Sequence, residues 1–211
     1  MSHKLLDRGI YAIINKRLNL VYVGETQRNF LIRWIEHLNN IYNHFDNQER
    51  TMLFLNEQTK FIVLKIMNET TYLKHDFFRY EQKAYEFYKR KGWGIVSKHN
   101  YNQEGKYSEF VNGDEKLIER YKKAINQMSI VLATKNTQHT NGSVILKKLY
   151  KQVERKFGTN VDKIKGESVL SRLNKDELEF MLLELYPRFY HKILDLSRTE
   201  YNKRDCQMSF F

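Results

Sequence analysis

The stretch that decides the fold is Gly9–Gly24, with the sequence GIYAIINKRLNLVYVG. Its two ends, Gly9–Ile14 and Leu20–Gly24, are short runs rich in β-branched and aromatic residues, a composition typical of β-strands. The polar residues Asn15–Asn19 between them are of the kind that form turns. Because a parallel return needs a long crossover, strands joined by so short a connection must be antiparallel neighbours. The segment therefore predicts a β-hairpin.

The residues that follow the hairpin predict helices around a small sheet. Apolar residues between Phe30 and Tyr42 recur at helical spacing, and Arg33 and His37 lie one turn apart on another face of the same helix. We expect an α/β (α+β) fold in which helices flank an antiparallel sheet of three strands. Its remaining elements are a helix over Asn47–Gln58, a strand over Lys60–Ile66 and a helix through Tyr80–Tyr88 that ends at Gly92.

The second half of the chain predicts a helical subdomain. Apolar residues recur at helical spacing over 117–132 and 146–157, and Asn174 with Glu177 resembles a capping box that begins a third helix. Pro187 is expected to end or kink that helix. We place the domain boundary near residue 107, which gives a catalytic domain over 1–106 and a helical region over 107–211.

Composition favours a polyanionic partner inside the cell. The 211 residues carry 36 Lys and Arg against 25 Asp and Glu, a net charge of +11, and such a surface gains affinity for nucleic acid by releasing counterions. The single cysteine, Cys206, excludes an internal disulfide framework and a zinc site built from cysteines. No long apolar run indicates a membrane span or a secretory signal. We therefore expect an intracellular, cytoplasmic protein.

The hydrolysis of a phosphodiester sets the residue types to search for. A water must lose a proton, and the charge that develops on the phosphate must be neutralised, which a carboxylate-bound divalent cation can do in part. Arginine matches phosphate oxygens through its planar fork, whereas a phenol becomes a base only beside a cation or a proton acceptor. Tyrosines, an arginine, a histidine and one carboxylate on a basic surface would meet these needs.

The chain holds this set in an order that resembles the GIY-YIG nuclease family. Gly9-Ile10-Tyr11 and Tyr22-Val23-Gly24 resemble the two family motifs, with Val23 in place of isoleucine, and Arg33–His37 matches the Arg-x-x-x-His of the first helix. Glu81, followed by aromatic residues, resembles the catalytic glutamate, although Ala84 stands where tryptophan is common. Tyr101-Asn102 resembles the final motif at a longer spacing, which leaves Asn100 as a second candidate. The resemblance covers about residues 8 to 103.

The resemblance implies a role for each matched residue. Tyr11 would be the general base, and Tyr22 would orient the water or share its proton. Arg33 would bind the scissile phosphate, and His37 would accept a proton or bind phosphate. Glu81 would hold Mg²⁺ or Mn²⁺, because hard oxygen ligands suit those ions, and Asn102 would bind a phosphate or position water.

Each of these residues, taken alone, also has a plain structural interpretation. Tyr11 and Tyr22 are suited to pack across a hairpin, and Arg33 with His37 is suited to a solvated helix face. In the helical half, one predicted helix carries a basic face that suits phosphate contacts or simply solvent. That face consists of Lys147, Lys148, Lys151, Arg155 and Lys156.

Taken together, the matches predict a divalent-metal-dependent endonuclease that cuts double-stranded DNA. We expect a site-specific restriction-type or phage/homing-type enzyme, and a dimer or transient pairing of two chains on DNA. The helical half would supply recognition or a dimer contact, as accessory regions do in the family. Three alternatives remain: a nucleic-acid-binding protein that keeps the fold without cutting, a repair nuclease that nicks DNA, and a helical protein-interaction factor.

Overall fold

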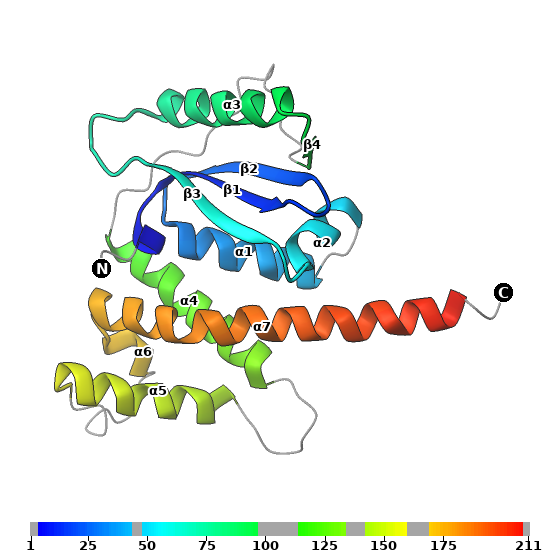
Figure 1. Cartoon of the computed structure of the whole chain (residues 1–211). Coiled ribbons are helices and arrows are strands. Elements are labelled where there is room, and N and C mark those ends of the chain that lie inside the picture. Colours follow the sequence, from blue (N-terminus) through cyan, green and yellow to red (C-terminus); the bar gives the residue numbers. More distant parts are fainter. Residues whose placement is uncertain (1–3, 44–47, 97–113, 134–141, 160–168, 209–211) are drawn as a thin grey trace. The chain divides into compact units, whose positions relative to one another are not determined.

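The computed structural model of the chain describes residues 4–43, 48–96, 114–133, 142–159 and 169–208. The chain divides into two compact units, Met1–Phe110 and Val111–Phe211. The first is a mixed α/β unit and the second contains only helices among the residues that are described (Figure 1).

The predicted hairpin is confirmed. Strand β1 (Gly9–Asn15) pairs antiparallel with β2 (Leu20–Thr26), with Tyr11 opposite Gly24 and Ile13 opposite Tyr22. Strand β3 (Lys60–Ile66) pairs antiparallel with the other edge of β1. The hairpin is therefore the centre of the sheet.

The sheet has four strands, so the prediction of three was wrong. The strand order is β3-β1-β2-β4, and β4 (Gly94–Ile95) runs parallel to β2. Its pairing is extended by two hydrogen bonds, from the Gly94 N–H to the Asn19 carbonyl at 2.9 Å and from the Val96 N–H to the Val21 carbonyl at 2.9 Å. A strand of two residues has no alternating pattern that a sequence could reveal.

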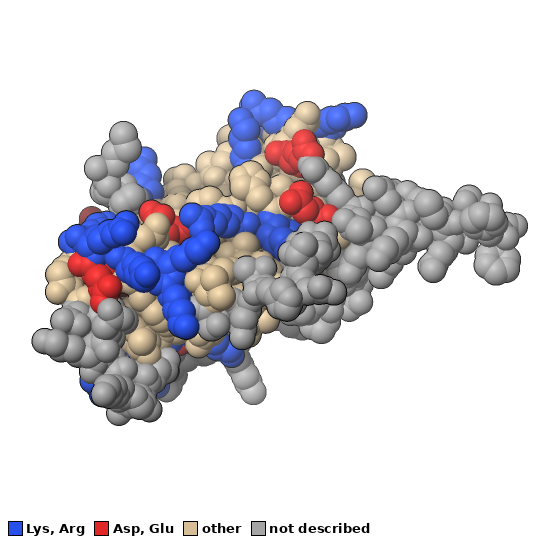
Figure 2. Space-filling view, turned by 90° about the horizontal axis from the view of Figure 1, so that it is seen from below, with Lys and Arg blue, Asp and Glu red and all other residues tan. Residues whose placement is uncertain are grey.

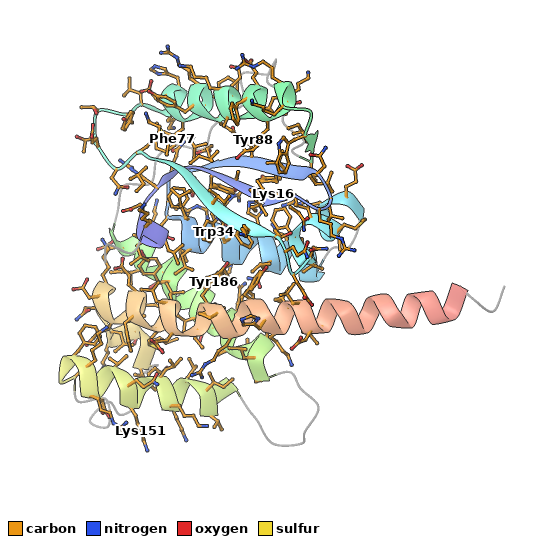
Figure 3. All side chains as sticks on the ribbon, in the orientation of Figure 1. Lys16, Trp34, Phe77, Tyr88, Lys151 and Tyr186 are labelled. Carbon is orange, nitrogen blue, oxygen red and sulfur yellow. The ribbon has the colours of Figure 1, made fainter. Side chains whose placement is uncertain are left out.

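Helices cover both faces of the sheet, α1 and α2 on one face and α3 on the other (Figure 1). Trp34 of α1 and Phe77 of α3 point towards the sheet from opposite sides, and both are buried (Figure 3). The elements outside the sheet are η1 (Lys4–Leu6), α1 (Phe30–Asn43), α2 (Gln48–Leu55) and α3 (Lys74–Arg90). Thus α2 is shorter than expected and α3 begins earlier.

The helical unit consists of α4 (Asp114–Ala133), α5 (Gly142–Phe157), α6 (Val169–Arg172) and α7 (Lys175–Met208). Its core includes buried apolar side chains from α4, α5 and α7, among them Ile125, Val153 and Leu182. The predicted capping box is confirmed at the start of α7: the Glu177 N–H donates to Asn174 Oδ1 at 3.0 Å, and the Asn174 N–H donates to Glu177 Oε2 at 2.8 Å.

Pro187 was expected to end or kink this helix, and α7 continues past it, so the helix does not end there. A proline inside a helix removes one backbone hydrogen bond, in this case the one to the Leu183 carbonyl. The flanking residues Leu185, Phe189 and Ile193 are buried at the spacing of one helical face. Their burial offsets the lost bond and keeps the helix continuous.

No helix in the described ranges is long and apolar enough to cross a lipid bilayer.

Candidate active site

The hairpin register brings Tyr11 and Tyr22 together on one face of the sheet. Residues 11 and 13 point to the same side of β1, and Tyr22 lies opposite Ile13, so the two phenols are diagonal neighbours. Their ring centroids lie 6.2 Å apart with planes 27° from parallel. Both side chains face α1 and α2, and both are buried.

Two glycines make the close packing of this region possible. A Cβ added at Gly24 would lie 2.5 Å from the phenolic oxygen of Tyr11 and 2.9 Å from a ring carbon of Tyr22. Gly9 has φ +148°, and a Cβ there would lie 2.0 Å from the carbonyl oxygen of Lys65. Both positions therefore require glycine. A side chain at position 9 would collide with the backbone of β3, and one at position 24 would collide with the two phenols.

Helix α1 places two nitrogen-bearing side chains on the hydroxyl of Tyr11. The Tyr11 oxygen lies 2.6 Å from Nε2 of His37, and Nε of Arg33 donates to the same oxygen at 3.3 Å. Asn29 caps the start of this helix, because its Oδ1 accepts a hydrogen bond from the Ile32 N–H at 2.8 Å. The helix start fixes where the two side chains reach the sheet.

Glu36 connects two arginines at the edge of this cluster. It forms an ion pair with Arg28, and its Oε2 lies 3.2 Å from a guanidinium nitrogen of Arg33. The side chain of Arg33 is 29% exposed, whereas Tyr11 is fully buried and His37 is 1% exposed. Solvent, and hence a phosphate, can therefore reach Arg33 directly, but it cannot reach Tyr11 or His37.

Arg50 of α2 approaches the same histidine from its other side. A guanidinium nitrogen of Arg50 lies 2.9 Å from Nδ1 of His37, and its guanidinium carbon lies 5.7 Å from the ring centroid of Tyr22 and 5.5 Å from that of Phe54. The sequence interpretation missed this residue. Arg50 lies outside the family motifs quoted above, and no periodicity in the sequence indicates that α2 packs against His37.

Glu81 enters the cluster from the opposite face of the sheet. It lies on α3, is 2% exposed and receives a hydrogen bond from the backbone of Glu25. Burial and the negative charge of Glu25 raise the pKa of Glu81 to about 8, although Arg33 opposes this shift. Glu81 in turn contributes to the raised pKa of Tyr11. Glu81 is thus electrostatically coupled to both Arg33 and Tyr11.

Glu25 is a second carboxylate that the sequence interpretation missed. Burial raises its pKa, against the opposing charges of Arg33 and Arg28. Within the part of the chain that is described, its buried Oε2 has no hydrogen-bond partner. Alternation along β2 could have indicated it, since Val21, Val23 and Glu25 point to the α3 face.

The charge states of the other side chains follow from burial and the surrounding arginines. Burial lowers the pKa of His37 well below its usual value, and Arg33, Arg50 and Arg28 lower it further, so the imidazole is neutral at pH 7. Burial, together with Tyr22, raises the pKa of Tyr11. Burial alone would lower the pKa of Arg33, but the two phenols and Glu36 outweigh it and raise that pKa.

A divalent cation fits the carboxylates of this site. No group of three or more His, Cys, Asp or Glu side chains is arranged to hold a metal ion in the described ranges. Mg²⁺, however, commonly binds to one or two carboxylates, with water and phosphate oxygens as its other ligands. The buried Glu81 and the unpartnered oxygen of Glu25 offer oxygen donors of this kind.

The remaining predicted site residues are the asparagine that follows α3 in the sequence and the basic face of the helical unit. Asn102 and the second candidate Asn100 lie outside the described residues. The basic face belongs to α5 of the helical unit, where Lys147, Lys148, Lys151 and Arg155 are all exposed. Figure 2 shows Lys and Arg side chains gathered over the side that carries α5, and Lys151 points away from the neighbouring helices (Figure 3).

Comparison with known proteins identifies the α/β unit. Residues 8–92 match the family model of the GIY-YIG catalytic domain, from the start of β1 to just beyond α3. No curated protein and no solved structure matched the chain. This part of the chain is therefore a GIY-YIG domain and has a nuclease-type fold, as the motif order predicted.

Proposed function

We propose that the chain is a divalent-metal-dependent endonuclease that hydrolyses phosphodiester bonds in double-stranded DNA. The observation that carries this proposal is the convergence of Arg33 and His37 on the Tyr11 oxygen, with Glu81 buried and electrostatically coupled to the same group. A hairpin that only packed aromatic rings would need neither a guanidinium nor a buried carboxylate, each of which is costly to bury.

The proposed roles follow from position. The exposed part of Arg33 binds the scissile phosphate and stabilises its developing charge. Once its own proton has passed to solvent, the Tyr11 oxygen, as the phenolate, takes a proton from the attacking water, which forms a bond to phosphorus as the bond to the leaving oxygen breaks. Because Tyr11 is fully buried, phosphate binding must draw Arg33 aside and open a path to that oxygen.

Glu81 and Glu25 are the residues that would hold a divalent cation. Such an ion, when bound, supplies positive charge beside the phosphate and favours the ionised forms of nearby acids. Positive charge is what a phenol of raised pKa needs in order to act as a base near neutral pH.

Within this class, a site-specific restriction-type or phage/homing-type enzyme is the function we propose. The exposed basic face of α5 supports a role for the helical unit in binding the DNA backbone. Cutting both strands usually needs two active sites, so we propose a dimer or a transient pairing of two chains on the DNA. Sedimentation of the protein on a DNA duplex measures this pairing.

The direct test is cleavage of plasmid DNA in Mg²⁺ or Mn²⁺. Glu81→Ala is expected to abolish cutting, and Glu86→Ala is a matched control because Glu86 is exposed on the same helix. Sequencing the cut ends on a genome-scale substrate then shows whether a site is recognised. If the unaltered protein bound DNA but did not cut it with any divalent ion, the proposed endonuclease activity would be rejected. That result would favour a DNA-binding protein with a nuclease-type fold.

A further inference from the structure

We propose that Arg50 is a positioning residue that holds the His37 imidazole with its proton on Nε2, so that His37 donates a hydrogen bond to the Tyr11 oxygen. This inference deepens the proposed nuclease function and rests on it only for its effect on catalysis. The hydrogen-bond arrangement itself can be tested without any cleavage.

The assignment follows from the hydrogen-bond capacity of each group. A guanidinium has only N–H donors and no acceptor, so the 2.9 Å contact between Arg50 and His37 requires a lone pair on Nδ1. A neutral imidazole carries one proton, which must then be on Nε2. The atom 2.6 Å from Nε2 is the Tyr11 oxygen, which therefore accepts.

The other arrangements of the ring fail on the same contacts. A ring turned by half a rotation about its bond to Cβ would place carbon atoms against both Arg50 and Tyr11 and lose both hydrogen bonds. A doubly protonated ring would direct an N–H group at the guanidinium of Arg50. The positive charges of Arg33, Arg50 and Arg28 around a buried ring disfavour that form as well.

Arg50 is held in place for this role. Its guanidinium lies near the faces of Tyr22 and Phe54, at 5.7 Å and 5.5 Å from their ring centroids. Phe54 lies on the same short helix and is fully buried, which anchors that helix beside the ring of His37 at a centroid distance of 5.2 Å. The position of the donor is therefore set by packing.

The arrangement changes what His37 does to Tyr11. The Tyr11 oxygen accepts two N–H donors, Nε2 of His37 and Nε of Arg33, and hydrogen bonds to the charged form of an acid favour that form. The proton of the hydroxyl group must then point away from both nitrogens. His37 thus stabilises the phenolate of Tyr11 and does not take its proton, which departs from the acceptor role that the family resemblance implied.

The tautomer can be observed directly by NMR of ¹⁵N-histidine-labelled protein without DNA or metal. Two-bond ¹H–¹⁵N correlations distinguish a proton on Nε2 from one on Nδ1, and the spectrum of His37→Gln assigns the signal. We expect the Nε2–H form in the unaltered protein and in Arg50→Lys, which keeps a donor. Arg50→Met is expected to populate the Nδ1–H form. Arg79→Met removes an exposed arginine of α3 and is expected to change nothing.

Two results would overturn the inference: an Nδ1–H tautomer in the unaltered protein, or an unchanged Nε2–H tautomer in folded Arg50→Met. The first needs no variant, so the test stands even where Arg50→Met fails to fold. The expected tautomer in a protein that cuts no DNA would leave the inference in place and reject the proposed function, so the two failures are distinguishable.

The catalytic readout is the maximal cleavage rate at saturating DNA. Arg50→Met is expected to lower that rate about 10- to 1,000-fold, part of the ~10²–10⁴-fold that a well-positioned acid or base supplies. Its DNA affinity is expected to stay near that of the unaltered protein, because the lost contact is internal. Arg50→Lys should recover a large part of the rate. Equal rates for the two variants would contradict the positioning role.

Discussion

The phenol of Tyr11 lies directly over the backbone of Gly24, its partner on the neighbouring strand. The two residues are paired in the register of β1 and β2, and a Cβ at position 24 would lie only 2.5 Å from the Tyr11 oxygen and 2.6 Å from the ring carbon that bears it. The Tyr11 side chain can therefore lie in this position only if residue 24 is a glycine.

Gly24→Ala is expected to displace the Tyr11 ring and break its hydrogen bonds to His37 and Arg33. We expect loss of most cleavage activity and a lower melting temperature, since inserting a methyl group into a packed core costs about 1–3 kcal/mol. Thermal unfolding and plasmid cleavage measure the two effects. Gly92→Asn is the matched control, because no atom lies within 4 Å of its added Cβ and asparagine tolerates its φ of +77°.

Arg33→Ala is expected to lower the cleavage rate by about 10³-fold or more while the protein stays folded. Glu36 keeps its ion pair with Arg28 in this variant, so the carboxylate of Glu36 is not left unpaired. Arg33→Lys is expected to recover little, because an ammonium lacks the planar fork that binds two phosphate oxygens. An exposed arginine on α3, Arg79, provides the control. Unchanged turnover in Arg33→Ala would remove Arg33 from the site.

The stability of the metal-free protein is expected to depend on Glu81. Its pKa is about 8 in the folded protein against 4.5 for an unperturbed glutamate, so the folded state binds more protons between these values. The unfolding free energy should therefore fall as pH rises from about 4.5 to about 8. Glu81→Gln should remove much of this loss and stabilise the protein above pH 8, on the order of 3 kcal/mol.

Denaturant titrations at a series of pH values in EDTA measure this dependence, with Glu86→Gln as the control. Divalent ions should counteract the same cost in the unaltered protein and raise its melting temperature. Little such rise is expected in Glu81→Gln. If Mg²⁺ raised the melting temperatures of the unaltered protein and of Glu81→Gln equally, the cation would not bind at Glu81.

The basic face of α5 is expected to contribute to DNA binding through phosphate contacts. Replacing Lys147, Lys148, Lys151 and Arg155 together by glutamine should weaken binding and reduce the slope of log affinity against log salt by about 2 to 4. A charge-matched control replaces four exposed residues of the other unit, Lys83, Lys89, Arg90 and Lys91. Equal effects of the two sets would show that net charge alone is responsible.

The sequence predicted those parts of the fold whose signals are local. Strand-type composition with a short polar turn revealed the hairpin, and helical periodicity revealed α1. The ordered motifs singled out four side chains that the structure brings together: Tyr11, Tyr22, Arg33 and His37. Their convergence was predictable because strand register and helix spacing, which are short-range properties, determine it.

The rest depends on packing between elements distant in the sequence. Arg50 reaches His37 only because α2 packs beside α1, and a helix of eight residues leaves no periodic signal of its orientation. Strand β4 forms because two residues after α3 pair with the backbone of β2. The length of α7 through Pro187 follows from apolar burial on one face, which outweighs a local preference.

The short strand β4 also has a consequence for Glu81, the proposed metal-binding carboxylate. At its start, α3 is held by Phe77, which packs against Ile10 and Met67, and at its end the backbone is tied to β2 through Gly94 and Val96. A helix held at both ends cannot slide by a turn of about 5.4 Å along its axis. The pairing of Gly94 and Ile95 with β2 therefore helps to fix the distance between Glu81 and Arg33. One residue inserted between Phe77 and Glu81 would misalign the pair even with every reacting group retained.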